Sequence, residues 1–85
     1  RLTEDYIDLF PSQAILYYYA GYANNKVGNY KKGKGYLEDG LEFLVEDVAL
    51  EKEFYKLLAV VYKNLGDPKK ESSYLEKAKE LEKRK

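Results

Sequence analysis

The chain has 85 residues, and its 15 Lys and Arg residues balance its 15 Asp and Glu residues. This zero formal charge argues against nucleic acid as the main partner, because a phosphate backbone is bound through clustered Lys and Arg. No apolar run approaches the roughly 18 residues that a membrane-spanning helix needs, so the sequence predicts no membrane partner. The absence of Cys and His excludes disulfides, thiolate metal sites and imidazole catalysis. Without Cys, the sequence also gives no indication of the redox state of the cellular compartment.

A first helix is predicted from Ala14 to Val27, where apolar residues recur with a helical period. Ser12, directly after a proline, is its expected N-cap. The run Ile15 to Tyr19 also fits a strand, but its counterpart 38 residues later is charged and helical in period. Gly28 and Asn29 then predict a helix stop and an N-cap, through a left-handed backbone and a side-chain acceptor.

A second helix with its own apolar stripe follows this turn. The third helix is predicted from Asp47, its expected N-cap, to Leu65. Gly66-Asp67-Pro68 predicts another stop and start, with Pro68 at the first helical position, where its missing N–H costs nothing. The last helix is expected to end near Arg84 among cations, which the helix dipole favours at a C-terminus.

One pattern occurs twice at an offset of 38 residues. Tyr17-(x)3-Gly21-(x)6-Gly28-Asn29-Tyr30 returns as Tyr55-(x)3-Ala59-(x)6-Gly66-Asp67-Pro68. Helix–turn–helix repeats of roughly 34 to 40 residues are typical of helical solenoids, which present surfaces to other macromolecules. The sequence therefore predicts an all-α fold of stacked antiparallel helical hairpins that binds a protein or peptide segment.

In these residues the chain resembles the tetratricopeptide repeat family. Tyr17 and Tyr55 match the early aromatic of the family's first helix, and the two Gly-Asn/Asp turns match its connection. The family's small and large apolar positions are matched by Ala20-Gly21, Leu58-Ala59, Gly33, Gly40, Ala78, Leu37 and Leu75. The resemblance implies a short right-handed superhelix in which each hairpin is one repeat.

The resemblance also divides the chain. It makes residues 1–11 the end of a preceding second helix, residues 12–47 the first repeat and residues 48–85 the second. Residues 1–11 carry apolar side chains, so a homo-oligomer formed through the exposed ends of the array is a further expectation. The repeat is about one helical turn longer than the family's 34 residues, and we place this insertion around residues 44–48. Asn24 and Glu71 replace the family's usual Tyr and Ala.

The segment Gly28 to Gly35 nearly matches the phosphate-binding loop G-x-x-x-x-G-K-[ST]. Gly35 stands where that loop needs a hydroxyl, and no buried strand precedes Gly28, so we interpret the segment as a turn and a small-residue helix face. Close packing accounts for Gly33 and Gly40 but not for Gly35, where local weakness is expected. The acidic residues of this half are interpreted as a solvated face. The sequence predicts no enzyme activity, catalytic residue, metal site or cofactor.

The resemblance places the binding surface on the inner face of the first helix of each repeat. Helical phase puts these candidate partner-binding residues on it: Ile15, Tyr18, Tyr19, Tyr22, Asn25, Lys26, Lys56, Leu57, Val60 and Asn64. The Lys and Asn clamp with which some family members hold a terminal carboxylate is not expected, because Tyr18, Tyr22 and Leu57 occupy its sites. The tyrosines on this face are better suited to an extended apolar or aromatic-rich segment than to a terminal carboxylate.

Other interpretations stay open at this point. Tyr18 and Tyr22 are equally compatible with a core that a preceding repeat seals. The chain also fits a structural spacer whose faces are all used internally, or a sensor whose groove takes a short peptide or small ligand.

Overall fold

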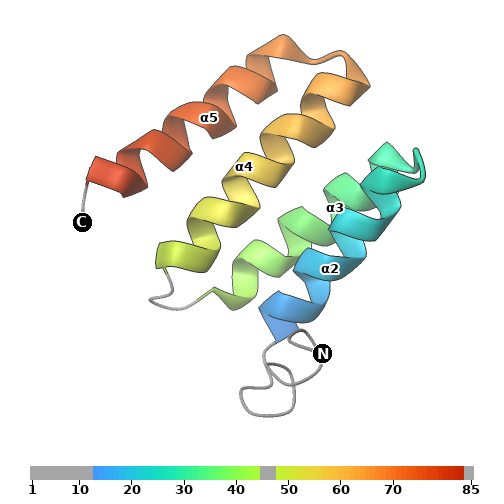
Figure 1. Cartoon of the computed structure of the whole chain (residues 1–85), viewed down its shortest axis with the longest axis horizontal. Coiled ribbons are helices and arrows are strands. Elements are labelled where there is room, and N and C mark those ends of the chain that lie inside the picture. Colours follow the sequence, from blue (N-terminus) through green and yellow to red (C-terminus); the bar gives the residue numbers. More distant parts are fainter. Residues whose placement is uncertain (1–12, 45–47, 84–85) are drawn as a thin grey trace.

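The computed structural model describes residues 13–44 and 48–83, and this part is all-helical (Figure 1). Its elements are α2 (Gln13–Lys26), α3 (Tyr30–Gly40), the short 3-10 helix η1 (Leu41–Phe43), α4 (Val48–Leu65) and α5 (Pro68–Lys83). The predicted all-α class is confirmed. The expected N-caps Ser12 and Asp47, the segment 1–11 and most of the proposed insertion lie outside the described residues.

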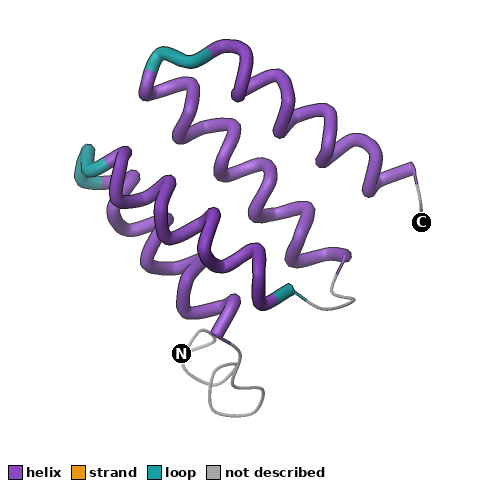
Figure 2. The backbone as a smooth tube through the Cα atoms, turned by 180° about the vertical axis from the view of Figure 1, so that it is seen from behind, coloured by secondary structure: helices purple, strands orange, loops and turns teal. Residues whose placement is uncertain are grey.

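The helices form two antiparallel hairpins, α2–α3 and α4–α5. Both views place α4 between α5 and the first hairpin, so that the hairpins lie side by side (Figures 1 and 2). Within the first hairpin, α4 packs mainly on α3 and touches α2 as well. No helix of the described ranges is both long and apolar enough to cross a membrane.

The two inter-helix turns have the same backbone hydrogen bonds. The N–H of Gly28 donates to the Asn25 carbonyl at 3.2 Å and that of Asn29 to the Asn24 carbonyl at 2.8 Å. In the second turn the N–H of Gly66 donates to Lys63 at 3.1 Å and that of Asp67 to Tyr62 at 2.9 Å. This pair of bonds is the Schellman motif, in which the residue after the helix takes a left-handed backbone. The φ angles of Gly28 (89°) and Gly66 (80°) satisfy it and confirm both predicted helix stops.

The two turns differ in how they start the next helix. Asp67 caps α5 as its sequence pattern predicts, since its Oδ1 accepts the Lys70 N–H at 3.1 Å. The predicted side-chain cap by Asn29 is wrong, because Asn29 makes no side-chain capping bond to α3. Its amide instead turns back to the preceding helix, with Nδ2 at 3.5 Å from Oδ1 of Asn24. The Asn29 side chain therefore contacts the preceding helix and does not cap α3.

The core lies where the hairpins meet, and its largest fully buried side chains are Phe54, Leu37, Leu58 and Val61. Glycines in α3 allow neighbouring helices to pack closely against it. A Cβ added at Gly40 would lie 2.7 Å from the Phe54 ring, and one at Gly33 would lie 3.0 Å from the Gly21 carbonyl oxygen. The predicted packing role of Gly33 and Gly40 is thus confirmed, and the buried Ala78 conforms as well.

Leu75 is not buried, although the resemblance placed it with Leu37 at the family's large apolar site. It corresponds by the 38-residue offset to Leu37, which is completely buried, yet Leu75 is 44 % exposed. The difference follows from position in the stack. Leu37 belongs to the core cluster together with Phe54, Leu58 and Val61 of α4, whereas α5 packs mainly on α4 alone.

Candidate functional site

The first helices of the two hairpins, α2 and α4, share a face. Tyr18 of α2 packs on Phe54 of α4 with ring centroids 5.4 Å apart. Further along, Nδ2 of Asn64 donates to Oδ1 of Asn25 at 3.2 Å. The Asn64–Asn25 bond joins two residues that sequence reasoning had placed on one surface, whereas the Tyr18–Phe54 contact joins a predicted surface residue to a buried core residue.

The candidate residues differ in burial. Tyr19, Tyr22 and Val60 are 41 %, 44 % and 46 % exposed, so they offer large apolar surface to a partner. Tyr18 and Leu57 are half-buried and pack against the core cluster. Among the described residues, Tyr22 is a surface residue, whereas Tyr18 packs partly on the core cluster.

Ile15 does not contribute to this surface. It is only 7 % exposed, so its inclusion among the candidate contacts is corrected. Its phase on α2 lies one turn before Tyr19, but burial cannot be read from the phase of a single helix. The polar candidates surround the apolar ones: Asn25 is half-buried, while Lys26, Lys56 and Asn64 are exposed.

Charge and aromatic rings alternate on this face. The Lys26 ammonium lies 5.7 Å from the centroid of the Tyr22 ring, a cation–π contact. Lys56 lies 4.0 Å from Glu53, and both side chains are about half exposed, so this ion pair adds little stability. Burial and the neighbouring Glu53 carboxylate raise the pKa of the Tyr18 phenol. Tyr18 is therefore a neutral hydrogen-bonding group at any physiological pH.

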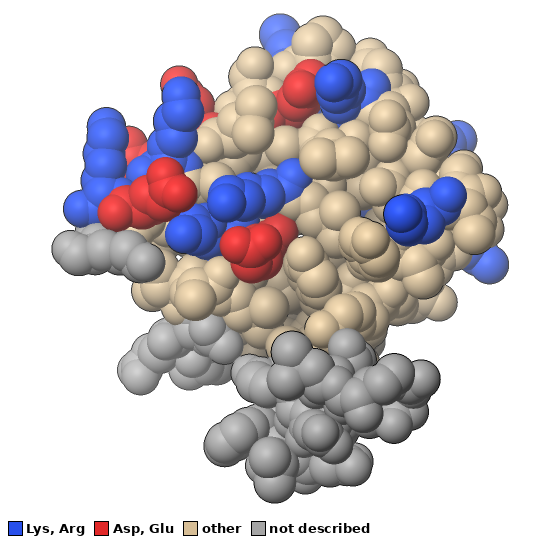
Figure 3. Space-filling view, viewed as in Figure 1, with Lys and Arg blue, Asp and Glu red and all other residues tan. Residues whose placement is uncertain are grey.

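Charges are distributed unevenly over the two hairpins. In the view of Figure 3, uncharged surface covers most of the α2–α3 side, whereas Lys, Asp and Glu alternate over α4 and α5. An uncharged, aromatic surface loses less solvation on binding than a charged one. The α2 side of the shared face is accordingly the better place to bury a partner.

Sequence reasoning did not predict a hydrogen bond that links the two hairpins. The Tyr62 hydroxyl donates to Oε2 of Glu38 at 2.5 Å, which links α4 to α3. Burial is the largest cause of a raised pKa of the Tyr62 phenol, and this hydrogen bond is the second. Tyr62 also stacks on Tyr74, with ring centroids 5.7 Å apart, and Lys34 lies 5.8 Å from its ring centroid. No local signal in the sequence pairs Tyr62 with Glu38.

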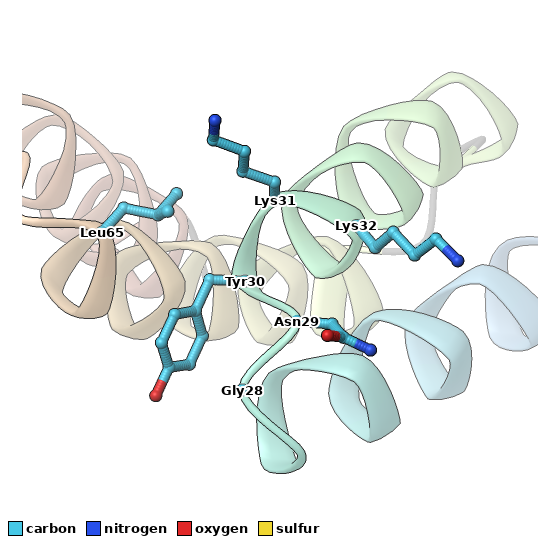
Figure 4. Close-up of a pocket in the computed structure, with 6 residues that line it drawn as sticks. All are labelled: Gly28, Asn29, Tyr30, Lys31, Lys32 and Leu65. Carbon is cyan, nitrogen blue, oxygen red and sulfur yellow. The ribbon is translucent and has the colours of Figure 1, made fainter.

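The glycine-lysine segment at the first turn forms an open cavity of about 410 Å³ lined by Gly28, Asn29, Tyr30, Lys31, Lys32 and Leu65. In Figure 4 the side chains of Lys31 and Lys32 point away from each other. A phosphate site needs converging donors, so this geometry supports the interpretation as a helix turn. Among residues 13–44 and 48–83, no three His, Cys, Asp or Glu side chains gather as metal ligands.

Comparison with known protein families, with curated protein sequences and with solved structures gives no match for this chain. The geometry of the shared α2–α4 face is therefore the basis on which a function is assigned.

Proposed function

We propose that this chain is a protein-interaction module, a tetratricopeptide-like pair of repeats, that binds an extended peptide segment on the shared face of α2 and α4. The observation that carries the proposal is a matched pair of exposed apolar positions. Tyr22 and Val60 stand 38 residues apart, one on each helix, and are exposed to nearly the same extent, 44 % and 46 %.

The chemistry of the face defines the partner. Exposed tyrosines bring large apolar area with few rotatable bonds, which is why they dominate binding energy at protein interfaces. Asn25 and Asn64 already bond each other across the two helices, and an amide has donor and acceptor capacity left for the backbone of an extended chain. The partner is therefore a segment with aromatic or aliphatic side chains that alternate with its backbone contacts.

A structural spacer is the second candidate, and the burial of Tyr18 and Leu57 favours it. These two residues use part of the same face for internal packing. Tyr19, Tyr22 and Val60, however, are the most exposed apolar candidates of the face, and a spacer offers no reason for their position.

Peptide binding can be tested by selecting ligands from a displayed peptide library against the full chain. The selected peptides are then titrated into isotope-labelled protein and amide chemical shifts are recorded. Shifts at Tyr22, Asn25 and Val60 support the proposal. No shift anywhere at millimolar peptide favours the spacer, and shifts confined to α5 place binding on another surface.

A pair of variants separates the binding residues from the core residues. Tyr22→Ala is expected to leave the melting temperature nearly unchanged and to weaken peptide binding, because its ring is exposed. Tyr18→Ala is expected to destabilise the fold by about 2–3 kcal/mol, because it removes the ring that packs on Phe54. Equal losses of stability in both variants would show that both rings belong to the core.

A further inference from the structure

The two ends of the shared α2–α4 face differ in charge. Toward the start of α4, Lys56 pairs with Glu53 at 4.0 Å, so the two charges cancel. At the other end, Lys26 and Lys63 are exposed, and no carboxylate in the described ranges forms an ion pair with either of them. The end of the face where α2 and α4 terminate therefore carries two positive charges without counter-charges.

Each of these lysines lies about one helical turn beyond an exposed apolar residue of the face. Lys26 is four residues after Tyr22, and its ammonium lies 5.7 Å from the centroid of the Tyr22 ring. Lys63 is three residues after Val60, so both lie on the same side of α4. A segment that packs on Tyr22 and Val60 and runs along the two helices therefore reaches the lysines at one end.

The charge of the lysines exceeds that of the helix dipoles at this end. The ends of α2 and α4 lie together, because Nδ2 of Asn64 donates to Oδ1 of Asn25 at 3.2 Å. Each helix end carries about half a negative charge, whereas each lysine carries a full positive charge. The two turns also occupy carbonyls of these ends, among them those of Asn25 and Lys63. A net positive potential thus remains for a partner to neutralise.

We propose that the partner segment carries an Asp or Glu two positions from the apolar or aromatic side chain that packs on Tyr22 and Val60. This inference rests on the proposed function. The helical rise puts each lysine about 4.5–6 Å along the helix axis from its apolar neighbour. In an extended chain, side chains on one face recur every two residues, or about 6.5–7 Å. Alternate side chains of one segment therefore match first the apolar centre and then the lysines.

The acidic group acts on selection among apolar segments. Ion pairs between exposed side chains add little to affinity, so the tyrosines and Val60 supply most of it. Complementary charge instead raises the association rate and disfavours segments with a basic residue at this position. Because the acidic group is a side chain, the segment needs no chain terminus at this site.

Paired charge variants of the full chain test the proposal with a peptide selected from the displayed library. Selected peptides are expected to be enriched in Asp or Glu at the stated spacing. Lys26→Gln combined with Lys63→Gln is expected to weaken binding about fivefold at low salt, and the difference should shrink at high salt. Lys69→Gln combined with Lys79→Gln is the matched control. It removes the same charge from exposed positions of α5 and should leave the affinity unchanged.

The outcomes separate this inference from the proposed function. A peptide whose binding is weakened by Tyr22→Ala but not by the Lys26 and Lys63 changes, together with no enrichment in acidic residues, overturns the charge inference alone. Equal losses in the two lysine double variants also overturn it, because the attraction then comes from the charge of the whole chain. If no selected peptide depends on Tyr22 or Val60, both the inference and the proposed function are wrong.

Discussion

At the scale of single residues, glycine occurs in two different environments within α3. A Cβ at Gly33 would meet the Gly21 carbonyl oxygen at 3.0 Å and the Asn25 nitrogen at 3.4 Å, both backbone atoms that cannot move aside cheaply. A Cβ at Gly35 would meet nothing within 4 Å. Gly33 therefore permits the approach of α2, whereas Gly35 only increases the freedom of the unfolded chain.

The two glycines are expected to respond to alanine in opposite directions. Gly35→Ala should stabilise the protein by about 0.5–1 kcal/mol, because it lowers the entropy of the unfolded chain without a clash. Gly33→Ala should destabilise it, because helix α3 must move away from α2. Urea unfolding of both variants checks the prediction. Destabilisation by Gly35→Ala would show that this position has a contact the structure lacks.

The Tyr62–Glu38 hydrogen bond gives the fold a pH dependence. Burial and this bond raise the folded-state pKa of Tyr62 above its ordinary value of about 10. The stability from this shift is fully present below about pH 10 and is lost as the pH rises above it.

Tyr62→Phe removes both effects. We expect a loss of about 1–2 kcal/mol at neutral pH, since Glu38 loses a charged hydrogen bond, and a smaller further loss between pH 9 and pH 11 than in the unmodified chain. Unfolding measured across this range tests the prediction. Tyr22→Phe is the control, since that ring keeps its contact with Lys26. An identical alkaline decline in Tyr62→Phe and the unmodified chain would contradict the assignment.

At the scale of elements, the two turns end their helices in the same way but begin the next ones differently. Both end in a Schellman motif at a glycine with positive φ. Only Asp67 adds a side-chain cap. The start of α3 is therefore less stable than the start of α5. The same helix contains Gly35, where an added Cβ would meet no atom within 4 Å.

Alanine at the two cap positions makes this difference measurable. Asp67→Ala should cost about 1 kcal/mol, the usual loss for an acidic cap, while Asn29→Ala should cost less than about half of that. Thermal unfolding of the two variants measures both losses and checks the prediction. A larger cost for Asn29→Ala would mean that its amide caps α3 in solution.

Element type and boundaries could be predicted from the sequence because their signals are local. Gly66-Asp67-Pro68 stops one helix and starts the next through its own backbone and side chain, so no distant residue is needed. The exposure of Leu75 and the Tyr62–Glu38 bond could not be predicted in this way. Both depend on which hairpin lies next to which, and helical period alone does not contain that information.

At the scale of the whole molecule, the face of the first hairpin that receives the second hairpin differs from the corresponding face of the second hairpin. The face of the first hairpin that receives the second includes Tyr18, Leu41 and Leu44, all packed on the core cluster. The corresponding positions of the second hairpin hold Lys56, Lys79 and Glu82, all exposed. Stacking copies head to tail would remove these charges from water, which is costly, so the chemistry disfavours that form of the predicted homo-oligomer.

The shared α2–α4 face also becomes clear only at this scale. Helical phase predicted most of its residues from each hairpin separately, because Tyr22 and Val60 stand 38 residues apart at matching positions in the sequence. Phase did not reveal that Ile15 is buried or that Asn25 and Asn64 bond across the helices. Those facts depend on the crossing of α2 and α4, which two isolated patterns do not specify.

The affinity of one selected peptide for two matched variants tests the central claim most directly. Val60 on α4 and Leu75 on α5 are exposed to almost the same extent, 46 % and 44 %, but only Val60 lies on the shared face. We expect Tyr22→Ala combined with Val60→Ala to weaken binding at least about tenfold, and Leu75→Ala to leave the affinity unchanged. Equal affinities for the two variants, or a loss only in Leu75→Ala, would contradict the assignment of this face as the binding surface.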